Sequence, residues 1–159
     1  MYIMKNFEGR MELILNNLEE TKKFGEKLGS LLKKGDVVCL NGDLAAGKTT
    51  LTKSIGIGMG IDDYITSPTF TIVNEYYGKL NLYHFDTYRL EGDNDVYYLG
   101  FDEYFYGDGV CVVEWADRIS SSLPECYLEL NITQLDENKR KIEINAVGDR
   151  AKELMEDLR

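Results

Sequence analysis

The spacing of hydrophobic side chains changes several times along the chain, and each change marks an expected element. Residues 11–15 alternate between the two faces of an extended chain, which predicts a strand. Residues 18–32 carry apolar side chains at intervals of three and four, which predicts an amphipathic helix, and Asn16 and Asn17 before it suit a turn or an N-cap. The apolar run at residues 36–40 is typical of a strand buried on both faces.

The rest of the chain continues as an alternation of helices and strands. A second helix is expected over residues 48–59, and Gly78-Lys79 suits a two-residue hairpin turn between two strand-like stretches. The further expected elements are strands at 70–77, 80–86 and 110–114, one or two short helices within 94–106, a hairpin of 127–134 and 139–147 around residues 136–138, and a helix at 149–159. The sequence therefore predicts an α/β fold, a single domain over residues 1–159 with a central mixed sheet flanked by helices.

The composition agrees with one packed domain. The chain has 159 residues, of which 43% are hydrophobic, and this is enough apolar material for a core. No apolar run reaches the ~18 residues that a membrane helix needs, and the first ten residues lack the apolar centre of a secretory signal. Cys39, Cys111 and Cys126 are too few and too far apart for a disulfide framework, so we interpret them as small hydrophobic residues. We expect a soluble, cytoplasmic protein.

The charge balance argues against direct binding of nucleic acid. The chain has 18 Lys and Arg residues and 28 Asp and Glu residues, which gives a formal net charge of −10 at pH 7. The long-range field of such a chain repels a polyanion. We therefore expect no DNA partner and no membrane partner, and if RNA is involved, a basic partner protein makes most of the phosphate contacts.

A phosphate-binding loop directly follows the buried strand at 36–40. The pattern G-x-x-x-x-G-K-[ST] is formed by Gly42, Asp43, Leu44, Ala45, Ala46, Gly47, Lys48 and Thr49. In this pattern backbone N–H groups cradle the phosphates, the lysine reaches the β- and γ-oxygens, and the Thr49 hydroxyl binds Mg²⁺. The helix that follows presents its N-terminus to the anion. The sequence thus predicts a P-loop NTPase.

The absence of a guanine-recognition motif indicates which nucleotide the loop prefers. Guanine-specific P-loop proteins usually carry Asn-Lys-x-Asp, and the single Asn-Lys pair, Asn138-Lys139, has Lys141 in place of the acid. ATP is therefore favoured over GTP.

Two carboxylates end expected strands, where open α/β sheets place their ligands. Asp86 ends the strand at 80–86, and Glu114 ends the strand at 110–114. A solvated acid at a strand end is the alternative for each. We favour Glu114 as the Mg²⁺ partner, directly or through water, and Asp86 as the group that orients the attacking water or as another catalytic contact.

Four further features allow more than one interpretation. His84 is either a hydrogen-bonded structural histidine, which we favour, or a catalytic one. Trp115 is either a core or surface aromatic residue or a stacking contact. Residues 67–70 form either an ordinary turn or a switch that senses the γ-phosphate. The aromatic side chains within residues 97–106 belong either to the core, which we favour, or to an interface. Exposed members would suggest a partner surface.

Five segments occur in an order and spacing that are far more specific than the P-loop alone. They are Gly-Asp-Leu-Ala-Ala-Gly-Lys-Thr-Thr at 42–50, Ser-Pro-Thr-Phe at 67–70, Asn-Glu-Tyr at 74–76, Tyr-His-Phe-Asp at 83–86 with Tyr-Arg-Leu at 88–90, and Glu-Trp at 114–115. In this set the chain resembles the TsaE family, the bacterial ATPases of tRNA threonylcarbamoyladenosine biosynthesis. Ala45 stands where that family usually has glycine, and Thr87 where it usually has leucine.

The resemblance implies a small P-loop fold that works with TsaB and with TsaD, the transferase that modifies the adenosine beside the anticodon. It implies ATP and Mg²⁺ as cofactors, with hydrolysis supporting repeated cycles of that assembly, and tRNA bound only indirectly. Carried over by motif, Lys48, Thr49 and Thr50 bind phosphate or metal, and Glu114 binds Mg²⁺. Asp86 is needed for activity, so Lys48 and Asp86 are the expected catalytic residues.

Two other functions fit the same phosphate motif. One is a nucleotide-gated assembly module, in which ATP stabilises a complex and hydrolysis is incidental. The other is a small-molecule kinase. Such kinases usually bring lid arginines to the phosphates, whereas this chain has six arginines, of which we expect only Arg89 beside a candidate site.

Overall fold

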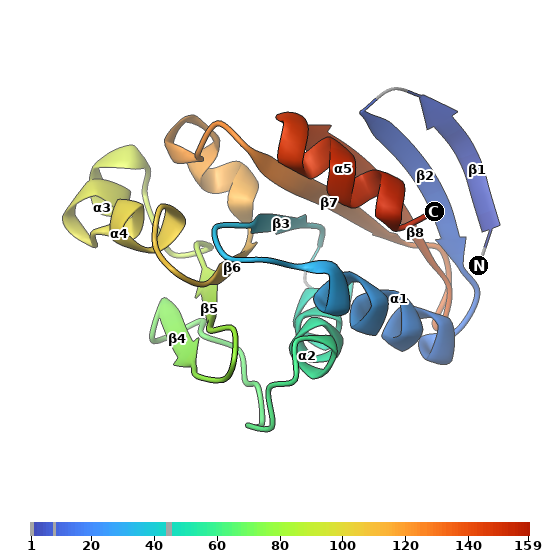
Figure 1. The fold of residues 1–159 in the computed structure, drawn as a ribbon, viewed down its shortest axis with the longest axis horizontal. Helices are drawn as coiled ribbons and strands as arrows, with labels where there is room; N and C mark the ends of the chain where they lie inside the picture. The colour runs from blue at the N-terminus through green and yellow to red at the C-terminus, as the bar shows by residue number, and fades with distance from the viewer. Residues whose placement is uncertain (1, 8, 44–45) are drawn as a thin grey trace.

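An eight-stranded mixed sheet organises the chain in this computed structural model, which describes residues 2–7, 9–43 and 46–159 (Figure 1). The strand order is β1-β2-β8-β7-β3-β6-β5-β4. The strands are β1 Tyr2–Phe7, β2 Arg10–Leu15, β3 Val37–Asn41, β4 Val73–Tyr76, β5 Leu82–Asp86, β6 Val110–Glu114, β7 Tyr127–Gln134 and β8 Arg140–Val147. The helices are α1 Leu18–Leu31, α2 Lys48–Gly58, α3 Asp93–Tyr98, α4 Phe101–Phe105 and α5 Asp149–Asp157, with a 3₁₀ segment η1 at Ala116–Ser122.

The centre of the sheet is parallel and its flanks are antiparallel. β3 pairs in parallel with β6 on one side and with β7 on the other, and β6 pairs in parallel with β5. The pairs β1/β2, β2/β8, β7/β8 and β4/β5 are antiparallel. The predicted α/β class with a mixed sheet is confirmed.

Two hydrophobic clusters cover the two faces of the central strands. Along β3, Val38 and Leu40 belong to the larger cluster, whereas Val37 and Cys39 belong to the smaller one. α1, α2 and α5 contribute to the larger cluster, and α3, α4 and η1 contribute to the smaller one. Because strand side chains alternate between faces, every second residue of β5 and β6 points toward α2.

The cysteines behave as small hydrophobic residues. Cys39 and Cys111 are buried, and all three cysteines are free. Burial raises the pKa of the Cys39 thiol well above its ordinary range and that of Cys111 to about 12. Among the described residues, no helix has the length and apolar character needed to cross a membrane.

Several expectations about local structure need correction. The predicted two-residue turn at Gly78-Lys79 is wrong, because five residues, 77–81, connect β4 to β5. Within this loop the Asn81 side chain accepts a hydrogen bond from the Gly78 N–H. The strand expected from residue 70 begins only at Val73, because Ile72 adopts a left-handed backbone with φ of 72°. β1 and η1 were not expected from the pattern.

Most of the remaining element boundaries agree with the expectation to within one or two residues. Asn17 is the N-cap of α1, and its side chain accepts a hydrogen bond from the Glu20 N–H. The segment 94–106 forms two short helices, and the last two strands form the expected hairpin.

Close packing between α1 and α2 depends on glycine. The two helices lie against each other below the sheet in Figure 1, and a Cβ atom at Gly29 of α1 would lie 2.1 Å from the carbonyl oxygen of Ile55. A Cβ atom at Gly58 of α2 would lie 2.0 Å from the carbonyl oxygen of Glu26. Glycine at these positions lets the two backbones approach each other directly.

We expect Gly29→Ala to lower the free energy of unfolding by about 1–3 kcal/mol, because the added methyl group overpacks the contact with α2. In an open helix the same change is stabilising by about 1 kcal/mol. Ser30→Ala, next to it on the exposed side of α1, is the control and should change stability by less than about 0.5 kcal/mol. Urea denaturation measures both, and a stabilised Gly29→Ala variant would contradict the packing argument.

Candidate functional site

Parallel pairing brings the ends of three strands to one edge of the sheet. In the register of the sheet, Leu40 of β3 lies opposite Glu114 of β6, and Glu114 lies opposite Asp86 of β5. The loop after β3 leads into α2, which begins at Lys48. The two predicted acids and the predicted phosphate loop therefore meet at the carboxyl ends of the parallel strands.

The phosphate loop ends in a conformation that starts a helix at once. Gly47 is the N-cap of α2 and has a left-handed backbone with φ of 98°, which a residue with a side chain rarely adopts. The first amides of α2 have no partner within the helix and point toward the loop. Leu44 and Ala45, both predicted to bind phosphate, lie outside the described residues.

The Lys48 side chain folds back over its own loop. Its ammonium donates to the carbonyl oxygens of Gly42, at 2.5 Å, and Asp43, at 2.9 Å. It also lies 4.0 Å from the centre of the Trp115 ring, a cation–π contact. Burial lowers the pKa of Lys48, and the negative charges of Glu114 and Asp86 oppose this shift.

Glu114 is buried and contacts α2. The Thr49 hydroxyl donates to its carboxylate, with Oγ1 3.1 Å from Oε1 and 3.2 Å from Oε2. His84 Nε2 forms a hydrogen bond with Oε2 from the neighbouring strand. Glu114 is therefore a buried carboxylate held by the P-loop helix, and not a solvated acid at a strand end.

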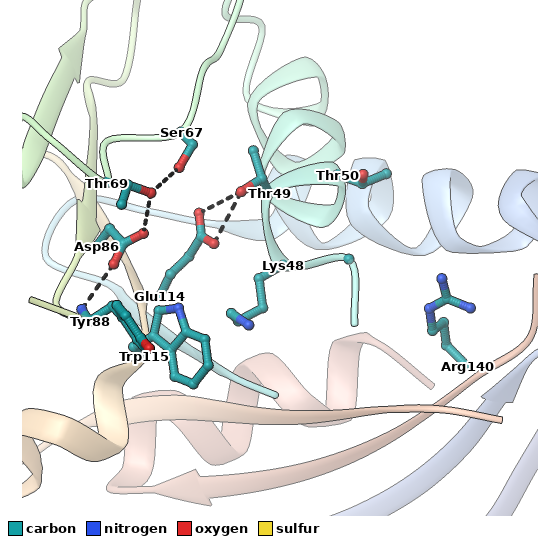
Figure 2. A pocket seen from close by; sticks show the side chains of 11 residues that line it. Lys48, Thr49, Thr50, Ser67, Thr69, Asp86, Tyr88, Glu114, Trp115 and Arg140 are labelled. Carbon is teal, nitrogen blue, oxygen red and sulfur yellow. Dashed lines mark hydrogen bonds between the residues drawn. The ribbon is translucent and has the colours of Figure 1, made fainter. Parts of the chain in front are cut away.

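Asp86 is held by the segment that follows α2. Its Oδ2 accepts a hydrogen bond from the Thr69 hydroxyl at 3.0 Å, and its Oδ1 accepts one from the Tyr88 N–H at 2.9 Å. Ser67 Oγ lies 2.7 Å from Thr69 Oγ1. In the segment with two possible interpretations, residues 67–70, the Thr69 hydroxyl thus contacts the carboxylate predicted to be catalytic, and Ser67 contacts Thr69 (Figure 2).

Trp115 turns the chain at the end of β6. Its backbone is left-handed, with φ of 61°, and its N–H donates to the Leu40 carbonyl oxygen. The buried Thr87 hydroxyl lies 2.6 Å from the Trp115 carbonyl oxygen and 3.1 Å from that of Glu114. The indole ring also packs beside Tyr88, at 4.8 Å between ring centres. Trp115 is therefore part of the site, and Thr87 helps to fix its backbone.

An open cavity of about 380 Å³ lies among these side chains. The residues that line it are Gly47, Lys48, Thr49, Thr50, Ser67, Thr69, Asp86, Tyr88, Glu114, Trp115 and Arg140. Figure 2 shows Asp86 and Thr69 at one end and Arg140 at the other, with Lys48 and Glu114 between them. Among the described residues, no group of three or more His, Cys, Asp and Glu side chains is placed to hold a metal ion by itself.

The fold and the cavity allow a comparison with known proteins. A family model described as "Threonylcarbamoyl adenosine biosynthesis protein TsaE" matches residues 15–142. The chain belongs to the TsaE family. Relatives named as tRNA threonylcarbamoyladenosine biosynthesis protein TsaE include one from Bacillus subtilis, 48% identical with 89% of each chain covered, and one from Treponema pallidum, 42% identical with 84% of this chain and 99% of the relative covered.

A solved structure confirms the fold of this TsaE family member. The crystal structure of Bacillus subtilis YdiB is 42% identical in sequence, with a TM-score of 0.80 and 97% of each chain covered. The resemblance expected from the five sequence segments is thus confirmed at the level of family and fold. The individual roles assigned to Lys48, Thr49, Thr50, Asp86 and Glu114 stay predictions.

Arg140 is the lining residue that the sequence did not indicate. The expectation that only Arg89 lies beside a candidate site is wrong, because Arg140 lines the cavity, and its Nε donates to the Ala46 carbonyl oxygen at 2.9 Å. Its Nη1 donates to carbonyl oxygens of the hairpin tip, including those of Asp136 and Glu137. Arg89 instead places its guanidinium 5.6 Å from the centre of the Phe70 ring.

The aromatic segment after β5 divides between core and surface. Phe101 and Phe105 are buried in the smaller hydrophobic cluster. Tyr97, Tyr98 and Tyr106 are exposed, with 80%, 83% and 69% of their surface accessible. Three exposed tyrosines near one another in the chain are typical of residues found at protein interfaces.

Proposed function

We propose that this TsaE family member binds ATP with Mg²⁺ in the cavity between α2, β5 and β6 and hydrolyses it. The observation that carries the proposal is the contact of Thr49, at the start of the P-loop helix, with the buried carboxylate of Glu114. A hydroxyl and a carboxylate at this place are the hard oxygen ligands that Mg²⁺ prefers. The family is involved in tRNA threonylcarbamoyladenosine biosynthesis, and the proposed ATPase acts in that process.

The phosphates of ATP would take over hydrogen bonds that the loop now makes with itself. The amides at the start of α2 and the Lys48 ammonium would bind the phosphate oxygens, with Lys48 leaving the carbonyl oxygens of Gly42 and Asp43. Thr49 and Glu114 would hold Mg²⁺, directly or through water, while phosphate oxygens and water supply the remaining ligands. The bound ion neutralises charge that develops on the phosphoryl group.

Asp86 is the proposed catalytic carboxylate. It faces the cavity beside Thr69, and hydrogen bonds from the Thr69 hydroxyl and the Tyr88 N–H fix its two oxygens. A carboxylate held in this way can orient a water molecule toward the terminal phosphate. The Thr69 hydroxyl links residues 67–70 to this group, which supports a switch role for that segment.

The proposed partners are TsaB and TsaD. The net charge of −10 opposes direct binding of tRNA, so we propose that tRNA meets the assembly through these partners. The guanidinium of Arg140 is engaged with carbonyl oxygens, and that of Arg89 lies over Phe70. Charge on the transferred phosphoryl group is therefore under-stabilised in the free chain, and a partner can supply the missing group.

We expect ATP with Mg²⁺ to stabilise the protein against thermal unfolding. A ligand at 100 times its dissociation constant adds about 2.7 kcal/mol to the free energy of unfolding. Lys48→Ala should remove most of this effect, whereas Lys53→Ala, on the same helix but outside the cavity lining, should retain it. Thermal shift measurements with ATP and GTP test both variants. An equal shift in Lys48→Ala, or a larger shift with GTP than with ATP, would contradict ATP binding at this loop.

The two acids should separate metal binding from catalysis. Glu114→Gln should weaken the Mg²⁺ dependence of ATP binding, because it removes the charge beside the proposed ion. Asp86→Asn keeps an acceptor for the Tyr88 N–H, and should hold ATP affinity within a few-fold while turnover is lost. Calorimetric titration with and without Mg²⁺, together with a phosphate-release assay, measures these effects. The reverse pattern, with binding lost in Asp86→Asn and Mg²⁺ dependence unchanged in Glu114→Gln, would exchange the two roles.

The isolated chain should hydrolyse ATP slowly. Addition of TsaB and TsaD should raise turnover at least about tenfold, which corresponds to about 1.4 kcal/mol of barrier. The same mixture with Lys48→Ala is the control for contaminating ATPases. Full turnover by the chain alone, or tight tRNA binding without partners at physiological salt, would indicate an autonomous enzyme. Assembly that requires ATP but is unaffected by loss of hydrolysis in Asp86→Asn would favour the nucleotide-gated module.

A further inference from the structure

The His84 side chain is buried completely and has one polar partner among the residues that the structure describes. None of its surface is accessible, and its Nε2 forms a hydrogen bond with Glu114 Oε2 across the parallel pair β5/β6. Its other ring nitrogen, Nδ1, is buried without a hydrogen-bond partner in this part of the chain. Within residues 2–7, 9–43 and 46–159, the one polar contact of the ring is therefore directed at the carboxylate proposed to hold the cation.

The chemistry of the carboxylate assigns the direction of this hydrogen bond. The oxygens of an ionised carboxylate only accept hydrogen bonds, so when Glu114 ligates a cation, His84 Nε2 is the donor of this bond. In the neutral imidazole Nδ1 then carries the lone pair, and burying this lone pair is less costly than burying an N–H without an acceptor.

The Glu114 carboxylate is thus held from two elements. Thr49 donates to it from α2, and His84 donates to it from β5. The two supports differ, because the Thr49 hydroxyl is itself a proposed ligand of the cation, whereas His84 lies on the far side and does not line the cavity. Without His84, the orientation of Glu114 would depend on the Thr49 hydroxyl, which is itself a proposed ligand of the ion.

Filling space does not account for a histidine at this position. Leu82, on the same face of β5, and Val112, opposite His84 in the register, are buried apolar residues of the larger hydrophobic cluster. An apolar side chain would complete this surface without burying an unpartnered nitrogen. The contact with Glu114 is what distinguishes histidine from leucine or methionine here.

We infer that His84 is a positioning residue, which holds Glu114 in the orientation that binds Mg²⁺ together with Thr49. This inference rests on the proposed function, because it concerns the proposed cation site. Hydrogen bonds to the groups that ligate a metal ion commonly change its affinity by about 10–100-fold when they are removed. Loss of the Nε2 donor should therefore be seen in the binding of the ion and not in that of the phosphates.

Two variants of similar volume separate the hydrogen bond from packing. His84→Gln keeps an N–H donor near the position of Nε2, and His84→Met removes it. We expect His84→Met to raise the Mg²⁺ concentration for half-maximal stabilisation by ATP at least about tenfold. His84→Gln should recover most of this loss. ATP affinity in EDTA, which depends on Lys48 and the loop, should stay within about twofold in both variants.

A second measurement reports the ion directly. Titration of Mn²⁺ into the ATP complex, followed by electron paramagnetic resonance, should show the same order of affinity, with wild type tightest, then His84→Gln, then His84→Met. If His84→Met does not fold, His84→Asn takes its place, because its amide is one methylene shorter than that of glutamine and cannot reach Glu114.

The outcomes distinguish this inference from the proposed function. Unchanged Mg²⁺ and Mn²⁺ affinities in the variant without a donor would overturn the positioning role. Equal losses in His84→Gln and in the variant without a donor, or equal losses of ATP affinity in EDTA, would show a structural role and also overturn it. If the wild-type protein binds no ATP or shows no Mg²⁺ dependence, the proposed function fails first and the inference fails with it.

Discussion

Parallel pairing of β3, β6 and β5 is the constraint on which the rest of the molecule depends. It brings the carboxyl ends of the three strands to one edge of the sheet. The alternation of side chains along each strand then determines which residues point toward α2. Leu82, His84 and Asp86 of β5 share one face, as do Val112 and Glu114 of β6. The same register that builds the larger hydrophobic cluster therefore also places the polar groups of the site.

The site concentrates charge on side chains that are largely buried. Lys48, Asp86 and Glu114 are each at least 95% buried, and each is hydrogen-bonded to named groups of the loop, the helix or the neighbouring segment. Buried charges without such partners are strongly destabilising. The network around them thus offsets the cost of burying these charges, and it keeps the side chains close to the positions in which they would act.

The sequence predicted the elements with strong local patterns and the residues with a chemical motif. β2, β3, β6 and the phosphate loop were found because each has a local signature. Arg140 was not found, because its contact with Ala46 joins residues 94 positions apart through the pairing of β8 with β7 and of β7 with β3. The interpretation of His84 as a hydrogen-bonded residue is confirmed, yet its partner Glu114 could be known only from the register of β5 with β6.

The phosphate loop makes internal hydrogen bonds that a phosphate would replace. Lys48 donates to two carbonyl oxygens of its own loop and packs on Trp115, so no buried ammonium hydrogen is left far from an acceptor or a π face. A phosphate oxygen carries a full negative charge, whereas a carbonyl oxygen carries only a partial one, so the Lys48 ammonium is attracted more strongly to the phosphate and the exchange favours the ligand. The released carbonyl oxygens of Gly42 and Asp43 are at the half-buried and exposed start of the loop, where water can solvate them. The arrangement therefore stabilises the loop without blocking the anion that it is proposed to bind.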